Sequence, residues 1–162
     1  MNSARPHARW LIALTLGIAL TLTILPLPVV LEAYRPEWAM LVILYWSLAL
    51  PARVGVGVAW LAGLLQDVLQ ATALGSHALA FALVAYLTIQ LYQRIRSVPI
   101  WQQALTVLVV LSAARGVLFV TRGLSDNPGV DWRFWLPVLT STLLWPPVFV
   151  LLRFLRRSFQ VN

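Results

Sequence analysis

Two charged side chains, Asp67 and Arg115, interrupt long apolar segments of the sequence. An ionisable group inside hydrocarbon is costly unless it meets a partner or water, so each is a candidate functional residue. Both fall within about two helical turns of the same predicted membrane face, and this similar depth allows an intramembrane ion pair between them. In the alternative interpretation, Asp67 caps the turn that follows it, while Arg115 extends its long side chain to the interface.

Side chains suited to catalysis or metal binding are few. The two histidines, His7 and His77, lack metal-ligand spacing, no carboxylate cluster accompanies them, and the sequence has no cysteine. Ser76 and His77 could meet Asp67 across a short turn, but Ser76 is better explained as the cap of the helix that begins there. Neither a phosphate-binding loop nor a dinucleotide fingerprint occurs. We therefore predict no catalytic residue, no metal and no cofactor.

Small residues recur at every fourth position in one apolar segment, at Gly55, Ala59 and Gly63. This spacing lets another helix backbone approach closely. The partner is either a helix of the same chain, which is the favoured interpretation, or a helix of another protein. Ser112 and Gly116 repeat the spacing once in the fifth predicted span.

The composition indicates the kind of protein that must position these residues. Of 162 residues, 60% are hydrophobic and 10% are charged, and the mean hydropathy is +0.83. A soluble domain cannot keep a polar surface at these values, so we expect an all-α polytopic membrane protein without an extramembrane domain. The formal net charge of +7 comes from arginines at the edges of apolar segments. That placement indicates membrane topology and lipid headgroup contact rather than nucleic-acid binding.

We expect about six transmembrane helices in a single domain that covers residues 1–162. The predicted spans are residues 10–31, 37–51, 54–70, 76–93, 100–121 and 133–153. Pro26 and Pro28 lie near the end of the first span, where a helix can stop or kink. The second span is short, with roughly 20 Å of helix. The Asp-Asn-Pro-Gly run at residues 126–129 predicts a turn before the last span.

The arginines predict the orientation of these spans. With six spans and a cytoplasmic N-terminus, eight arginines lie on the cytoplasmic side without an acidic residue: Arg5, Arg9, Arg53, Arg94, Arg96, Arg153, Arg156 and Arg157. The other side carries Arg35, Arg122 and Arg133 beside Glu32, Glu37, Asp126 and Asp131. Because cytoplasmic loops are enriched in basic residues, we predict that both termini are cytoplasmic in a bacterial inner membrane.

Two other topologies bear on the short second segment. If it did not cross, every later loop would change sides and most arginines would lie outside, so five spans fit the charges poorly. A re-entrant hairpin from Trp38 to Leu69 would preserve the orientation of the later spans. Only the membrane side on which Arg53 lies would then distinguish a re-entrant hairpin from two full spans.

Several short motifs, in order across most of the chain, resemble the MreD family of rod shape-determining membrane proteins of Gram-negative bacteria. The motifs of the first half are Arg35-Pro36-Glu37-Trp38, Leu44-Tyr45-Trp46, Ala49-Leu50-Pro51 and Arg53-Val54-Gly55-Val56-Gly57. Those of the second half are Gly63-Leu64-Leu65-Gln66-Asp67 with Gly75, then Trp101-Gln102-Gln103-Ala104-Leu105 and Leu144-Trp145-Pro146. Arg115 has no counterpart in this pattern.

The resemblance implies a non-enzymatic scaffold of the rod-shape or elongation complex, which supports lateral peptidoglycan synthesis and cell shape. It implies a fold similar to the substrate-binding subunits of vitamin-importing (ECF-type) transporters. The implied partners are MreC, bound directly, and MreB, RodA and a penicillin-binding transpeptidase in a larger complex. We expect MreC to contact the loops at residues 32–37 and 122–133, and a groove shaped by the small-residue face or by Asp67 and Gly75.

Two other functions stay open at this stage. A small-molecule-binding transporter subunit would use the few polar residues of the spans, namely Gln66, Asp67, His77 and Arg115. A membrane-embedded enzyme acting on a lipid-linked wall precursor would depend on Asp67. The sequence leaves the oligomeric state and the helix face that binds MreC undetermined, because apolar faces in a bilayer look alike.

Overall fold

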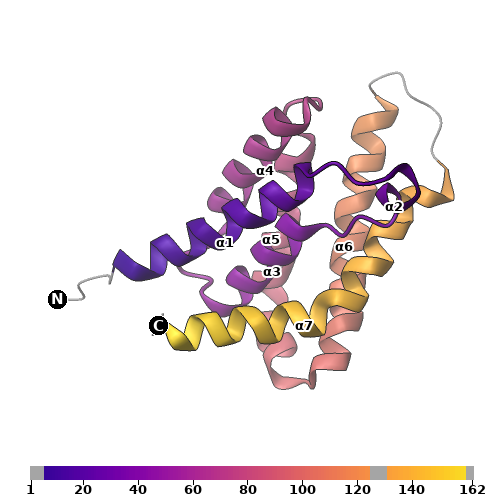
Figure 1. The fold of residues 1–162 in the computed structure, drawn as a ribbon. Helices are drawn as coiled ribbons and strands as arrows, with labels where there is room; N and C mark the ends of the chain where they lie inside the picture. The colour runs from indigo at the N-terminus through magenta and orange to yellow at the C-terminus, as the bar shows by residue number, and fades with distance from the viewer. Residues whose placement is uncertain (1–5, 125–130, 160–162) are drawn as a thin grey trace.

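A computed structural model describes residues 6–124 and 131–159, and all regular secondary structure in that part of the chain is helical (Figure 1). The all-α prediction is therefore confirmed, while the turn predicted at residues 126–129 lies outside the described residues. The elements are α1 (Pro6–Ile24), α2 (Val29–Glu32), α3 (Trp38–Ala49), α4 (Val56–Gln70), α5 (Ser76–Ser97), α6 (Ile100–Gly123), the 3-10 helix η1 (Trp132–Trp135) and α7 (Leu136–Ser158).

Prolines set several of the helix boundaries. Pro26 and Pro28 lack the N–H groups that would continue α1, which ends at Ile24, earlier than the predicted end of the first span. The rest of that segment forms a loop that contains the single turn of α2. Leu50 precedes Pro51 and leaves the helical region at φ −138°, which ends α3.

The short helix α3 is the centre of the bundle. Every residue from Ala39 to Leu48 is buried, and α1, α5 and α7 pack around the helix. A helix that is apolar on every side is suited to such burial. Its 12 residues extend over about 18 Å, which is less than the roughly 30 Å thickness of a hydrocarbon core. A short axial helix among longer ones leaves space beyond each of its ends.

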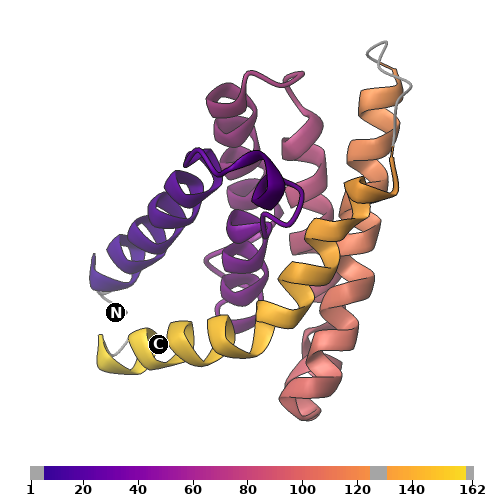
Figure 2. The same cartoon turned by 45° about the vertical axis from the view of Figure 1, so that its right-hand side comes forward.

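The other helices pack in chain order around this centre. α4 lies antiparallel to α5, α5 packs on α6, and α6 packs on α7. α7 contains Pro146 and Pro147 near its middle, and it bends along its length in Figure 2. Because an internal proline removes a hydrogen bond and crowds the preceding turn, the proline pair accounts for the bend.

Three helical segments are long and apolar enough to cross a membrane: Ser76–Ser97, Ile100–Gly123 and Trp132–Ser158. Three shorter apolar helices accompany them: Ala8–Ile24, Trp38–Ala49 and Val56–Gln70. Each of the six predicted spans therefore contains an apolar helix. The number of membrane crossings stays a prediction.

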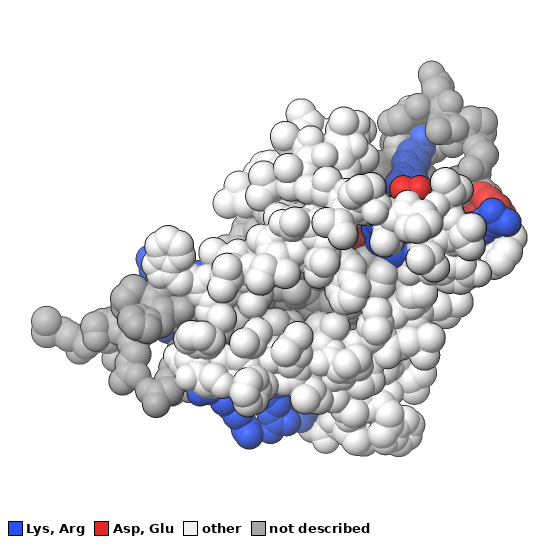
Figure 3. All heavy atoms as spheres, viewed as in Figure 1, with Lys and Arg blue, Asp and Glu red and all other residues white. Residues whose placement is uncertain are grey.

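Charged side chains gather at two opposite ends of the molecule, with apolar surface between them (Figure 3). We call one the acid-bearing end; it holds the loop between α1 and α3, the α4–α5 turn and the start of α7. We call the other the arginine end; it holds the start of α1, the α3–α4 and α5–α6 connections and the end of α7 (Figure 1). Among the described residues, the second end carries seven arginines without Asp or Glu: Arg9, Arg53, Arg94, Arg96, Arg153, Arg156 and Arg157.

Candidate functional site

Asp67 is a hydrogen-bonding hub between α4 and α5. Its Oδ1 atom accepts hydrogen bonds from the Thr72 hydroxyl at 2.8 Å and the His77 backbone N–H at 3.0 Å, and it lies 2.8 Å from His77 Nδ1. Its Oδ2 atom accepts hydrogen bonds from the backbone N–H groups of Gly75 at 2.9 Å and Ala78 at 3.3 Å. The side chain is completely buried. These five contacts replace the water that the carboxylate has lost.

The turn after α4 is shaped to present these donors. Ala71 at φ 52° and Gly75 at φ 99° both occupy the left-handed region, and between them the chain reverses direction. α5 then begins at Ser76, so the Asp67 carboxylate lies against the first N–H groups of that helix. Helix N-termini leave backbone donors unpaired and favour negative charge. The geometry therefore supports the capping interpretation of Asp67.

Arg115 pairs with Glu37 at the same end of the molecule. Arg115 Nη2 lies 3.1 Å from Glu37 Oε1, and both side chains are nearly buried. The Glu37 backbone N–H donates to Ser141 Oγ at 2.8 Å, which ties the start of α3 to α7. The guanidinium carbons of Arg115 and Arg122 lie 4.4 Å and 5.0 Å from the Phe134 ring centroid, within cation–π range.

The predicted ion pair between Asp67 and Arg115 is not formed in the described structure. Asp67 points into the α4–α5 turn, where backbone donors satisfy it, while Arg115 is held on α6 by Glu37. Both residues lie toward the acid-bearing end, but each has a different partner there. Arg115 also does not extend to the interface, since it is only 7% exposed. Its partner, Glu37, comes from the segment at residues 32–37, which the sequence predicts to be a loop.

A polar cavity of about 160 Å³ is lined by the Glu37–Arg115 pair and by His77, a partner of Asp67. Its lining includes Gln66, His77 and Arg115, three of the four polar residues that the sequence offered for a ligand. Gln66 Oε1, Arg115 Nε and Arg35 Nε are buried there without a hydrogen-bond partner. Such groups need water or another polar group, so this cavity is suited to water or a very small polar ligand.

The small-residue face of α4 is used inside the chain. A Cβ atom added at Gly63 would lie 2.5 Å from the Ala78 Cα atom, so α5 occupies this face in close backbone contact. Ala59 is fully buried, whereas a Cβ atom at Gly55 would meet only the Pro51 carbonyl oxygen at 3.9 Å. The favoured interpretation, a partner within the chain, therefore describes Ala59 and Gly63. The same burial removes this part of the face from any groove for another protein.

An apolar recess of about 320 Å³ opens between the α1–α3 loop and η1 at the acid-bearing end. It is lined by Val29, Val30, Ala33 and Tyr34 from the first segment and by Trp132, Arg133 and Leu136 from the second. The two segments are far apart in the sequence and meet here. The sequence predicts both loops but carries no signal for the hollow between them.

Among residues 6–124 and 131–159, no three His, Cys, Asp or Glu side chains lie close enough to hold a metal ion.

Comparison with known proteins identifies a family. The model of the family described as "rod shape-determining protein MreD" matches residues 4–155. A curated rod shape-determining protein MreD from Haemophilus influenzae is 34% identical over 145 residues, which cover 90% of each chain. No solved structure matches the chain, so the predicted similarity to vitamin-transporter subunits stays a prediction.

Proposed function

The chain belongs to the MreD family of rod shape-determining proteins, and from this premise we propose that it is a non-enzymatic membrane scaffold that binds MreC. Family membership gives it a role in cell shape. In this proposal, it supports lateral peptidoglycan synthesis together with MreB, RodA and a penicillin-binding transpeptidase. It lies in the bacterial inner membrane with both termini in the cytoplasm, as the arginine distribution predicts.

The apolar recess between α2 and η1 is the observation that carries this proposal. Val29, Val30 and Trp132 on its walls are 86%, 78% and 66% exposed. At its edge, Arg133 lies 3.6 Å from Asp131 in an exposed ion pair. An apolar hollow with a polar rim is the usual anatomy of a protein interface. We expect a membrane-proximal segment of MreC to place an apolar anchor side chain in it.

Both walls of the recess are held in place by polar contacts. The Arg35 guanidinium donates to the Leu25 carbonyl oxygen at 2.6 Å and also to the Thr23 carbonyl oxygen, which fixes the loop after α1. Phe134 of η1 lies under the guanidinium groups of Arg115 and Arg122. A surface that is ordered before binding loses less entropy when a partner arrives, which favours a docking role.

Crosslinking and affinity capture from detergent-solubilised membranes test the docking role. Trp132→Ala, combined with Val30→Asp, is expected to reduce MreC recovery at least about tenfold, because buried aromatic anchors dominate interfaces. Trp101→Ala is the matched control, since Trp101 is 63% exposed at the arginine end and lies outside the recess. Equal MreC recovery from both variants would contradict the proposal.

The polar cavity favours a second candidate, a small-molecule-binding transporter subunit. It brings Gln66, His77 and Arg115 together around unpartnered polar atoms. Its volume of about 160 Å³ is below the roughly 300–1,000 Å³ of pockets that hold drug-sized ligands, which weighs against a vitamin. Tight stoichiometric binding of a small metabolite that Gln66→Leu abolishes would promote this candidate.

A further inference from the structure

A recess of about 450 Å³ lies at the arginine end, beyond the C-terminus of α3. Three elements form it: the end of α3, the connection between α5 and α6, and the end of α7. Its lining residues are Tyr45, Leu48, Ala49, Arg96, Val98, Pro99, Ile100, Gln103, Phe149, Arg153, Arg156 and Arg157. Four of these are arginines, and none is acidic.

The arginines of this recess lack negative partners within the described chain. The ion pairs of the described residues all lie at the acid-bearing end, and none includes Arg96, Arg153 or Arg156. Arg153 and Arg156 line the recess together with the buried Tyr45 side chain and lie within electrostatic reach of it. Like charges at one place repel each other, and an anion that neutralises them would bind strongly.

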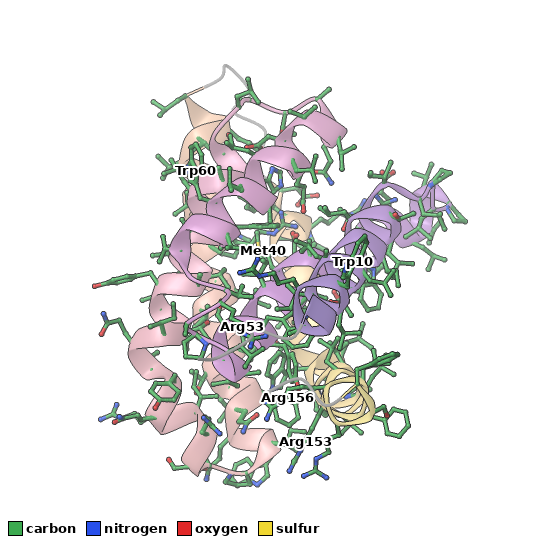
Figure 4. The ribbon with its side chains drawn as sticks, turned by 90° about the vertical axis from the view of Figure 1, so that its left-hand side faces the viewer. Trp10, Met40, Arg53, Trp60, Arg153 and Arg156 are labelled. Atoms are coloured by element: carbon green, nitrogen blue, oxygen red, sulfur yellow. The ribbon has the colours of Figure 1, made fainter. Side chains whose placement is uncertain are left out.

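Membrane topology alone does not explain this grouping of arginines. Arg53 and Arg94 lie at the same end of the molecule and serve topology equally well, yet neither lines the recess. Arg153 and Arg156 come from α7 and Arg96 from α5, and they reach one hollow. Figure 4 shows Arg153 and Arg156 near each other on α7 and Arg53 on a separate segment.

Gln103 in the lining of the recess supplies an independent indication of a ligand. Its side chain is 6% exposed, and its Nε2 atom donates to the Ile95 and Val98 carbonyl oxygens at 2.9 Å and 3.3 Å. Its Oε1 atom is buried and has no hydrogen-bond partner. A buried acceptor without a donor is costly, so an occupant that supplies an O–H or N–H group as well as a negative charge fits this recess.

We infer that this recess binds the headgroup of an anionic phospholipid that carries a hydroxyl group, as in phosphatidylglycerol. The phosphate meets Arg96, Arg153 and Arg156, and the headgroup hydroxyl donates to Gln103 Oε1. Apolar lining residues such as Leu48 and Phe149 accept the first carbons of the lipid chains. The recess lies where apolar helices end, at the level of lipid phosphates. This site is independent of MreC docking at the opposite end.

Native mass spectrometry of the delipidated protein in detergent tests the lipid site. Titration with phosphatidylglycerol is expected to give one bound lipid per chain, with affinity at least about tenfold above phosphatidylcholine. Arg153→Gln combined with Arg156→Gln should remove this preference, because two phosphate-binding charges are lost. The matched control, Arg53→Gln with Arg94→Gln, removes two charges at the same end and should keep it. If both double variants lost the preference for phosphatidylglycerol equally, general charge attraction would explain the binding and the proposed site would be wrong.

A second lipid tests the role of Gln103 without any variant. Phosphatidylmethanol has the same charge as phosphatidylglycerol but no headgroup hydroxyl, so it is expected to bind several-fold more weakly. Equal binding of the two lipids would overturn the Gln103 contact. Displacement of the bound lipid by millimolar glycerol phosphate would show that the recess takes free phosphate esters and would overturn the lipid assignment.

Discussion

At the acid-bearing end, the buried Asp67, Glu37 and Arg115 side chains have polar partners within the chain. At the arginine end, by contrast, the arginines of the recess face no carboxylate among the described residues. Asp67 accepts hydrogen bonds from one turn of the chain, and Arg115 pairs with Glu37. Arg153 and Arg156 have no acidic partner in the part of the chain that the structure describes. Charges with internal partners mainly stabilise a fold, while charges without them favour binding. The two ends should therefore respond differently to substitution.

Asp67→Ala should have the largest effect and would sharpen this contrast. It leaves three backbone N–H groups and the His77 ring without their acceptor, at a cost of about 3–5 kcal/mol. Thermal unfolding in detergent, followed by tryptophan fluorescence, measures the loss. Arg94→Gln at the other end is the control and should change stability by less than about 0.5 kcal/mol. Similar unfolding temperatures for both variants would break the comparison.

Gly63→Ala tests the close backbone contact between α4 and α5. The new methyl group would collide with the backbone of α5 at Ala78, so α4 and α5 must separate, at a cost of about 3 kcal/mol. Gly57→Ala in the same helix is the matched control, because its added Cβ atom meets nothing within 4 Å. It should be neutral or slightly stabilising, since alanine favours a helix. An unchanged unfolding temperature for Gly63→Ala would contradict the close packing.

A double-mutant cycle on Glu37→Gln and Arg115→Gln measures the pairing energy at the acid-bearing end. Either single change leaves a buried charge without its partner, so the coupling energy should be about 2 kcal/mol. The double variant should then be more stable than the sum of the single effects predicts. Arg35→Gln with Glu37→Gln serves as the control cycle, because no ion pair joins those two side chains in the described structure. Additive effects in the first cycle would count against the Glu37–Arg115 pair.

Ala71→Gly should have the smallest effect and the opposite sign. Ala71 is exposed in the left-handed region at φ 52°, where glycine is favoured. The change should raise stability by about 0.5–1 kcal/mol. Ala73→Gly is the control in the same turn. Ala73 is also exposed, but its φ is not positive, so its replacement by glycine should be neutral or destabilising. A lower unfolding temperature for Ala71→Gly than for Ala73→Gly would show that the positive φ of Ala71 does not strain the turn.

Local signals in the sequence were sufficient to predict where the helices lie and how the charged residues divide between the two ends. Apolar runs bounded by prolines such as Pro51 and Pro99 predict where helices lie, because proline removes a backbone donor at a defined position. The early end of α1 was the main difference, since a proline permits either a kink or a stop. Gly63 was identified from spacing alone, and its close contact with α5 follows from the same physics.

The partners of the charged residues could not be predicted in the same way. Asp67 is satisfied largely by backbone N–H groups, which every residue except proline carries, so the sequence does not indicate which of them it binds. Glu37 reaches Arg115 because α3 starts inside the bundle, and an apolar pattern cannot place one helix relative to another in a membrane. The recess lined by Gln103 and Arg153 likewise depends on tertiary packing.

The shortness of α3 also has an electrical consequence. If water fills the recesses beyond its two ends, the low-dielectric barrier along the axis of the molecule is about 18 Å instead of the roughly 30 Å of the surrounding lipid. A transmembrane voltage would then fall over the shorter distance, and the field along α3 would be about 1.7 times that in the bilayer. Glu37 at the start of α3 and Tyr45 in its C-terminal half each line one of these two hollows. In a membrane-spanning arrangement, a change in the membrane voltage would therefore act on both ends of the protein at once.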